Sequence, residues 1–321
     1  MQQSMGPDLT VSPKSITPSG TPVKSAAERT KRDDEVTLRR TILKVCCTLL
    51  AASSVWGSWS CTAKAHLKWI AFYGQTADEH ALSSYDIVIL DPAFQGSVTG
   101  IAKTGARVCA YLSLGEVRTS DPLYNQVDRS ALFGENNDWP GTFRIDIRYR
   151  SWKALVLEKL IPDIYSKGFT GLLLDTLDTP SYLERLDPDG NRGMGQAAAE
   201  LVREVRRSFP NLLVFMNRGY ALLPSVTDCI DGVVAESLLT TFIPGENGGY
   251  GWNQPSEVAH QLSLLSPVMH RHTPLPVLSL DYWDAGDPGT IKEIYARERA
   301  LGCHPYVATR MLDSIIPEPA G

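Results

Sequence analysis

Carboxylates recur in this sequence at the ends of short apolar runs, a position from which they can act as acids, bases or nucleophiles on a bound substrate. Asp175 ends the run GLLLD, and Glu236 ends the run GVVAE. Two carboxyl groups that flank one sugar can cleave its glycosidic bond, one as the general acid and the other as nucleophile or base. We therefore take Asp175 and Glu236 as the candidate catalytic pair.

Further polar residues end the neighbouring apolar runs. A carboxylate that leaves an apolar interior costs roughly several kcal/mol if it stays unpaired, so a purely structural sequence rarely places many of them together. Any single one could instead cap a helix or anchor a loop through a salt bridge. Together they predict a substrate-binding cleft lined by Tyr73, Asp91, Glu116, Asp178, Asn217, Arg218, Asp281 and Tyr282.

The apolar runs alternate with helical patterns between residues 66 and 316. Most runs are continuously apolar, as in parallel strands that are covered on both faces. Eight such units over roughly 250 residues predict a single (β/α)8 TIM barrel with a short or absent last helix. The competing fold, a doubly wound open sheet, would carry a glycine-rich phosphate loop after its first strand, and none is present. We expect strands at 68–74, 85–92, 107–116, 171–178, 211–219, 232–237, 276–283 and 304–312.

The barrel prediction brings the two candidate catalytic residues together. In a parallel barrel the chemistry lies at the C-terminal ends of the strands. Asp175 and Glu236 fall on expected strands four and six, so their backbones should stand roughly 9–10 Å apart, two inter-strand spacings. Converging side chains would bring the carboxyl groups to about 5–6 Å, which favours retention, whereas diverging ones would leave the longer inverting gap.

Two long connections are expected near the cleft. One follows the third strand (117–150), and the other, GENGGYGW (245–252), is rich in glycine and reads as a flap or as an ordinary surface loop. Aromatic rings can pack against the CH faces of sugars. The candidate aromatic residues are Tyr73, Trp139, Tyr250, Trp252, Tyr282 and Trp283.

Composition and motifs exclude several other functions. The net charge of −5 argues against a general nucleic-acid binder, which usually carries a basic excess. The sequence has no CxxC pair, no HExxH, no GxSxG and no GxxxxGK[ST], so structural zinc, metalloprotease, α/β-hydrolase and P-loop chemistry are disfavoured. We expect neither a metal nor a cofactor, and the expected partner is a polysaccharide substrate.

The N-terminal region is predicted to be a targeting segment rather than a folded domain. Residues 1–35 are rich in Pro, Ser and Thr and should be disordered. Residues 36–65 combine the basic string RRTILK, an apolar run and Ala63-Lys64-Ala65, which predicts a cleaved signal segment and a secreted or cell-envelope location. RRTILK also resembles a twin-arginine signal. One alternative is that the segment stays attached as a membrane anchor. Another is lipid attachment at Cys61, although the residues before it match a lipobox poorly.

Six strings spread over the rest of the chain resemble glycoside hydrolase family 114, the endo-α-1,4-polygalactosaminidases. No single string is diagnostic, but their order is fairly specific. After Glu116 the family continues with another acidic residue and a Tyr-Arg pair, where this chain has Val117-Arg118-Thr119, which affects substrate preference more than the core chemistry. The strings are YLSLGE (111–116), WPGTFRIDIR (139–148), GFTGLLLDTLD (168–178), FMNRG (215–219), VVAES (233–237) and LDYW (280–283).

The resemblance implies a (β/α)8 barrel and an endo-acting, retaining hydrolase of galactosamine-containing polysaccharide. It gives Asp175 the nucleophile role and Glu236 the general acid/base role, with the pKa of Glu236 raised by burial and by the Asp175 charge. It places Asp91, Glu116, Asn217 and Asp281 along the subsites. The alternatives are a hydrolase for another cell-wall or extracellular glycan and a non-catalytic carbohydrate-binding barrel.

Overall fold

The computed structural model describes residues 66–245 and 248–320. The predicted leader (1–35), the targeting segment (36–65) and the Cys61 alternative lie outside the described residues. In the described part of the chain, no helix has both the length and the apolar character needed to span a bilayer.

Eight parallel strands form one sheet in the order β1-β2-β3-β7-β8-β9-β12-β13. β1 also contacts β13, where the Trp69 indole donates to the His304 carbonyl at 2.7 Å and the Tyr73 amide to the Leu312 carbonyl at 2.5 Å. The predicted (β/α)8 barrel is therefore confirmed. The barrel strands are β1 (Trp69–Phe72), β2 (Ile87–Leu90), β3 (Arg107–Ser113), β7 (Gly171–Asp175), β8 (Leu213–Asn217), β9 (Gly232–Glu236), β12 (Val277–Tyr282) and β13 (His304–Ala308).

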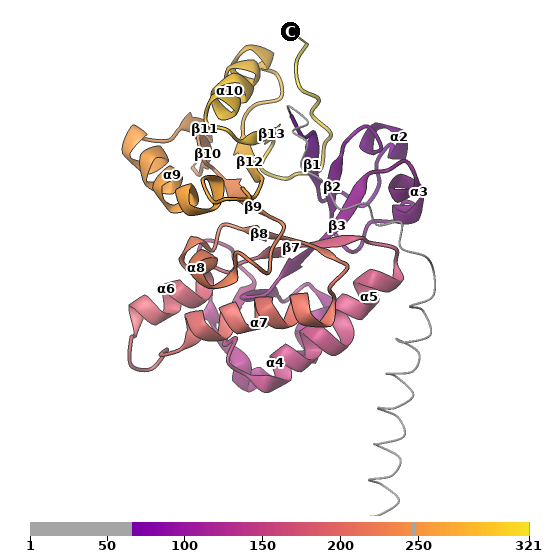
Figure 1. The fold of residues 1–321 in the computed structure, drawn as a ribbon. Helices are drawn as coiled ribbons and strands as arrows, with labels where there is room; N and C mark the ends of the chain where they lie inside the picture. Colours follow the sequence, from indigo (N-terminus) through magenta and orange to yellow (C-terminus); the bar gives the residue numbers. More distant parts are fainter. Residues whose placement is uncertain (1–65, 246–247, 321) are drawn as a thin grey trace, which may run out of the picture. The chain divides into compact units, whose positions relative to one another are not determined.

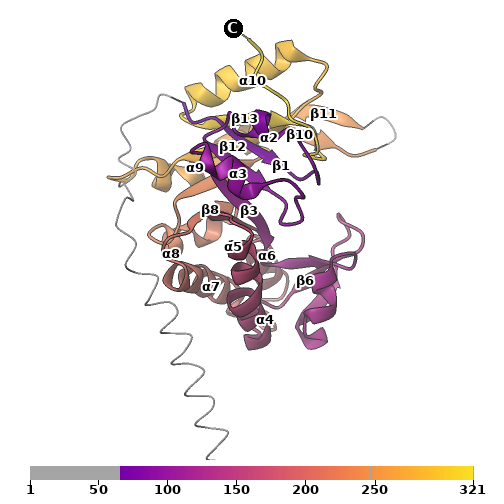
Figure 2. The same ribbon diagram turned by 90° about the vertical axis from the view of Figure 1, so that its right-hand side faces the viewer.

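Helices surround the strands and cover their outer face (Figures 1 and 2). Residues 309–320, after the last strand, form no helix, in line with the expected short or absent final helix. The helices are α2 (Glu79–Leu82), α3 (Val98–Lys103), α4 (Arg150–Leu155), α5 (Ile161–Ser166), α6 (Thr179–Leu186), α7 (Met194–Ser208), α8 (Leu223–Val226), α9 (Pro255–Met269) and α10 (Pro288–Ala300).

Apolar periodicity explains why these segments fold as they do. β1 and β2 are buried along their whole length, because core side chains fill one face and helices cover the other. In α7 the residues Met194, Ala198, Leu201, Val202 and Val205 recur at three- and four-residue steps and are all buried. That stripe packs the helix against the sheet.

Two small antiparallel sheets occupy the long connections that the sequence left without secondary structure. After β3, the strands β4 (Glu116–Arg118), β6 (Thr142–Ile145) and β5 (Leu132–Glu135) pair in that order. After β9, β10 (Thr240–Ile243) and β11 (Gly249–Trp252) form a hairpin where a glycine-rich flap or an ordinary surface loop was expected. The expected strand 107–116 was too long, because β3 ends at Ser113 and Glu116 begins β4.

The turn between β3 and β4 packs directly against the end of β7. A Cβ atom on Gly115 would lie 2.3 Å from the Thr176 carbonyl oxygen, and Thr176 follows Asp175. Gly115→Ala should lower the free energy of unfolding by about 1–3 kcal/mol, because the added methyl group overpacks this contact. Urea unfolding measures the effect.

The matched control is Gly134→Ala in β5, where an added Cβ would have no atom within 4 Å. Its stability should stay within about 0.5 kcal/mol of the wild type. Equal stability of the two variants would show that the Gly115 contact does not constrain this turn.

Candidate active site

One amide group holds the two candidate catalytic carboxylates together. Asn217, at the end of β8, lies between Asp175 on β7 and Glu236 on β9. Its Nδ2 donates to Asp175 Oδ1 at 2.8 Å and to Glu236 Oε2 at 2.7 Å. Because both bonds share one nitrogen, the two oxygens are separated by less than the two distances added together, about 5.5 Å. The two carboxyl groups therefore face one small volume.

Two tyrosines complete the hydrogen bonding of the pair. Tyr111 on β3 donates its hydroxyl to Asp175 Oδ2 at 2.8 Å, and Tyr282 on β12 donates to Glu236 Oε1 at 2.7 Å. All four carboxylate oxygens thus accept a hydrogen bond. The five residues come from adjacent strands in the order β3-β7-β8-β9-β12, so the sheet itself fixes their spacing.

The backbone turns sharply directly after Asp175, Asn217 and Glu236. Thr176, Arg218 and Ser237, which directly follow Asp175, Asn217 and Glu236, have φ values of 59°, 49° and 53°. Non-glycine residues rarely adopt this left-handed region, and each costs on the order of 1–3 kcal/mol. Such repeated strain at three neighbouring strand ends marks a functional site rather than a scaffold.

Burial and like charge act on Asp175. They raise its pKa to about 6, burial being the larger cause and the Glu236 charge the second, while hydrogen bonds from Thr176, Tyr111 and Asn217 lower it. We expected these two effects at Glu236, and the structure shows them acting on Asp175. Asp175 therefore takes up a proton as the pH falls through about 6.

Three tyrosines beside the pair have raised pKa values and stay neutral. Burial, followed by the negative charges of Asp175 and Glu236, raises the pKa of Tyr73. Burial also leads the causes that raise the pKa values of Tyr111 and Tyr282. The rings of Tyr73 and Tyr111 lie 5.1 Å apart, so Tyr73 belongs to the same cluster.

Three other predicted cleft residues are at least partly exposed. Asp91 is half-buried, accepts a hydrogen bond from the Ala93 amide at 2.7 Å, and its charge helps raise the pKa of Tyr73. Arg218 is half-buried at the turn after β8, and Asp178 is exposed just before α6.

Two predicted cleft residues anchor loops instead. Glu116 is buried and accepts hydrogen bonds from Asn136 Nδ2 at 3.0 and 3.1 Å and from Thr179 Oγ1 at 3.0 Å. It thereby ties the β4-β6-β5 sheet to the start of α6. The prediction that Glu116 lines a subsite does not fit this placement, because its carboxylate is already occupied by protein donors.

Asp281 is the second correction. It is 1% exposed, and its Oδ1 accepts from the Leu239 amide at 2.9 Å and from the Thr240 amide at 2.5 Å. Side chains alternate along a strand, so Asp281 points to the helix layer while its neighbour Tyr282 points into the barrel. Asp281 therefore holds the start of the β10–β11 hairpin.

Asp281 shares its buried site with Glu298 of α10, which is fully buried. If both were ionised, Asp281 Oδ2, both Glu298 oxygens and Ser279 Oγ would be buried without a partner. A proton on Glu298 lets it donate to Asp281 and accept from Ser279. Burial and the Asp281 charge raise the pKa of Glu298 well above its usual range, which favours this neutral form.

An arginine joins the two inserted segments at the rim of the barrel. The Arg310 guanidinium lies over the Trp139 ring at 4.5 Å and over the Phe242 ring at 4.4 Å, and its amide faces the Tyr250 hydroxyl at 3.4 Å. Trp139 follows β5, Phe242 lies on β10 and Arg310 follows β13, so segments inserted after β3 and β9 meet there. Phe242, Tyr111 and Glu298 were missed from the sequence.

Neutral Glu298 has a direct test. Glu298→Gln should keep stability near the wild type, because the amide can donate to Asp281 and accept from Ser279 as the protonated acid does. Glu298→Ala should lower the free energy of unfolding by about 2–4 kcal/mol, since it leaves Asp281 charged and unpaired in the interior. Chemical unfolding at pH 7 separates the two, and an equal loss in both would mean that Glu298 is ionised.

Known proteins share this fold. The glycoside hydrolase domain of PelA from Pseudomonas aeruginosa superposes with a TM-score of 0.69 at 24% identity, over 77% of this chain and 96% of that one. Aspergillus fumigatus Ega3, solved in complex with galactosamine, gives a TM-score of 0.58 at 15% identity, over 78% and 93%. An uncharacterized protein of Deinococcus radiodurans is 27% identical over 259 residues, covering 76% of this chain and 80% of its own.

The sequence family extends over nearly the whole chain. The model of the glycoside-hydrolase family GH114 matches residues 48–320, which include every strand of the barrel and both carboxylates of the bridged pair. The match agrees with the family to which the sequence strings pointed. This chain belongs to glycoside hydrolase family GH114.

Proposed function

We propose that this protein is an exported, endo-acting, retaining hydrolase of galactosamine-containing polysaccharide, with Asp175 and Glu236 as its catalytic residues. The Asn217-bridged carboxylate pair carries the proposal. Asp175 Oδ1 and Glu236 Oε2 lie within about 5.5 Å of each other, close to the separation of roughly 5–5.5 Å at which a carboxylate can attack the sugar directly. An inverting enzyme needs a wider gap for a water molecule.

The chemistry divides between the two carboxyl groups. Glu236 donates its proton to the leaving glycosidic oxygen while ionised Asp175 attacks the anomeric carbon and forms a glycosyl ester. Glu236 then takes a proton from water, whose oxygen attacks the same carbon and releases the sugar and Asp175. Tyr282 and Asn217 hold Glu236 in place through both steps, and Tyr111 and Asn217 do the same for Asp175.

The substrate class is supported by charge and by the family. A polymer with free amino groups is cationic, and the ionised member of the carboxylate pair attracts it. Ega3, which shares this fold, was solved with galactosamine bound. Arg118, where the chain departs from the family pattern, is close enough for its charge to lower the pKa of Tyr73 and Tyr111. A hydrolase for another extracellular glycan is therefore the second candidate.

Conservative substitution of either carboxylate tests the proposal. Asp175→Asn and Glu236→Gln should each reduce turnover of galactosamine polymer by at least about 100-fold. Release of reducing ends measures this, and a panel of other polysaccharides identifies the second candidate. Asp163→Asn and Glu158→Gln, two exposed carboxylates outside the site, are the matched controls. Sugar binding that persists in wild type without any product would instead indicate a non-catalytic barrel.

Aryl glycosides with a good leaving group separate the two roles. They need little help from an acid, so Glu236→Gln should retain activity on them and Asp175→Asn should not. Asp175→Asn should also unfold less readily than wild type at pH 7.5. Its pKa of about 6 means that ionised Asp175 destabilises the fold by up to about 3 kcal/mol, a cost that grows from pH 4 to 6 and is absent in the variant.

The raised pKa of Asp175 predicts a pH profile. Asp175 loses its proton as the pH rises through about 6 and must be ionised to attack, so kcat/KM should rise on the acidic side with an apparent pKa near that value. Tyr111→Phe removes a hydrogen bond that favours ionised Asp175, so the pKa rises and the acidic limb moves to higher pH. Tyr85→Phe, a half-buried tyrosine elsewhere, should leave the limb unmoved. A downward shift in Tyr111→Phe would refute this assignment.

A further inference from the structure

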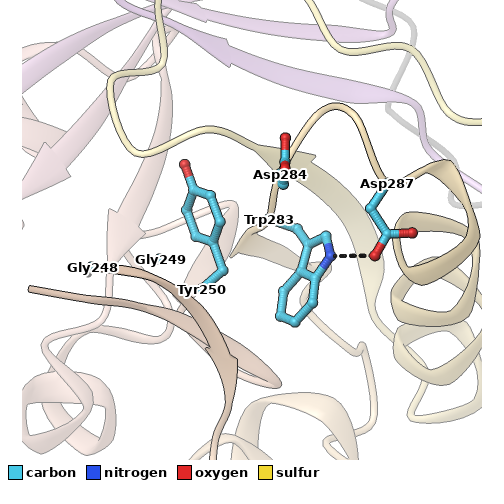
Figure 3. A pocket seen from close by; sticks show the side chains of 6 residues that line it. All are labelled: Gly248, Gly249, Tyr250, Trp283, Asp284 and Asp287. Carbon is cyan, nitrogen blue, oxygen red and sulfur yellow. Dashed lines mark hydrogen bonds between the residues drawn. The ribbon is translucent and has the colours of Figure 1, made fainter.

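A cavity of about 390 Å³ lies between the β10–β11 hairpin and the start of α10, apart from the carboxylate pair. Figure 3 shows the hairpin on one side of it and the segment that follows β12 on the other. A Cβ atom on Gly249 would meet nothing within 4 Å, so this wall of the cavity is open. The lining residues are Gly248, Gly249, Tyr250, Trp283, Asp284 and Asp287.

The aromatic wall of the cavity is held rigidly. The Trp283 indole donates to Asp287 Oδ2 at 3.1 Å (Figure 3). The Trp283 backbone amide donates to the Ala308 carbonyl at 2.9 Å. Tyr250 and Trp252 of the hairpin pack against it with ring centroids at 6.3 and 5.8 Å. A fixed indole of this kind can receive the apolar face of a sugar ring or a cation.

The same cavity carries negative charge. Neither Asp284 nor Asp287 forms an ion pair with any residue in 66–245 or 248–320. Hydrogen bonds, first of all from Thr290, keep the pKa of Asp287 below its usual value. Asp284 is exposed, and only its Oδ1 accepts a hydrogen bond, from the Gly286 amide at 2.9 Å. Its Oδ2 is available to a ligand.

We propose that this cavity is a second carbohydrate-binding site that takes one unit of a hexosamine with a free amino group. The apolar face of the ring would pack on Trp283 and its ammonium group would bind the Asp284 carboxylate. The volume is sufficient for a sugar ring, since small-molecule sites begin at about 300 Å³. The choice of an amino sugar rests on the proposed function.

The backbone connects this cavity to the candidate active site. Trp283 directly follows Tyr282, whose hydroxyl binds Glu236. Tyr250 lines the cavity and also reaches Arg310 at the barrel rim. Under the proposal, a polymer whose scissile bond lies at Glu236 reaches the cavity by way of Tyr250, which contacts both the rim and the cavity. Binding one unit there holds the chain without contacting the bond that breaks.

Calorimetry with short galactosamine oligosaccharides tests the site. The experiment uses Asp175→Asn as the background, so that no probe is consumed. Asp284→Asn should weaken oligosaccharide affinity about five- to tenfold, because it removes a charge-assisted contact from an exposed position. Gly249→Leu should do the same by filling the open wall. Asp163→Asn, on α5, is the control and should leave the affinity unchanged.

N-acetylated oligosaccharides test whether the amino group of the sugar contributes to binding. Fully N-acetylated oligosaccharides should bind less tightly and should not distinguish Asp284→Asn from the background, because they carry no ammonium group. If Asp284→Asn and Gly249→Leu bind the free-amine probe like the control, the second site is refuted. Cleavage of polymer by wild type together with that result would leave the proposed function standing. Weakened binding without any cleavage by wild type would keep the second site and refute the hydrolase.

Discussion

The candidate active site depends on one hydrogen-bond donor, the Asn217 side-chain amide, that two carboxylates share. Asn217 gives both of its amide hydrogens to carboxylates on the strands at either side, so two like charges are held within about 5.5 Å. Like charges at that range repel, and their burial adds to the cost. The protein offsets the cost by raising the pKa of Asp175 to about 6 and by placing two tyrosine hydroxyls that leave no carboxylate oxygen unsatisfied. The sheet order then fixes the geometry, because all five residues lie on adjacent strands.

A second set of buried carboxylates holds the loops around the candidate active site in place. Glu116 holds the sheet inserted after β3, and Asp281, supported by neutral Glu298, holds the hairpin inserted after β9. Both anchors act where the chain makes a strained turn or approaches one: Gly115 packs on Thr176, and Leu239–Thr240 follow Ser237. Buried acids thus have two uses here, the chemistry proposed for the pair inside the barrel and restraint of the loops around it.

The sequence predicts the strands well because parallel strands that are covered on both faces are continuous apolar runs. It also predicts that Asp175 and Glu236 lie close together, since each ends such a run, and Asn217 bridges them in the structure. The prediction that Asp281 lines the cleft fails, although alternation along β12 already implies that Asp281 and Tyr282 cannot both face the barrel interior. Glu116 was misplaced because a three-residue strand has no recognisable period. The left-handed turns after Asp175, Asn217 and Glu236 leave no signal, since Thr, Arg and Ser are ordinary residues elsewhere.

Charge is distributed unequally between the two candidate sugar sites, and this links binding to catalysis. Asp175 takes up a proton as the pH falls through about 6, whereas hydrogen bonds keep the pKa of Asp287 in the outer cavity below its usual value. Attraction of a cationic chain to the cavity therefore persists in mildly acidic conditions in which Asp175 is neutral. The proposed chemistry needs ionised Asp175, because one carboxyl group must attack the sugar while the other donates a proton. Chain capture would then extend to lower pH than bond cleavage, with the outer cavity providing the electrostatic attraction that Asp175 gives up when it takes up its proton.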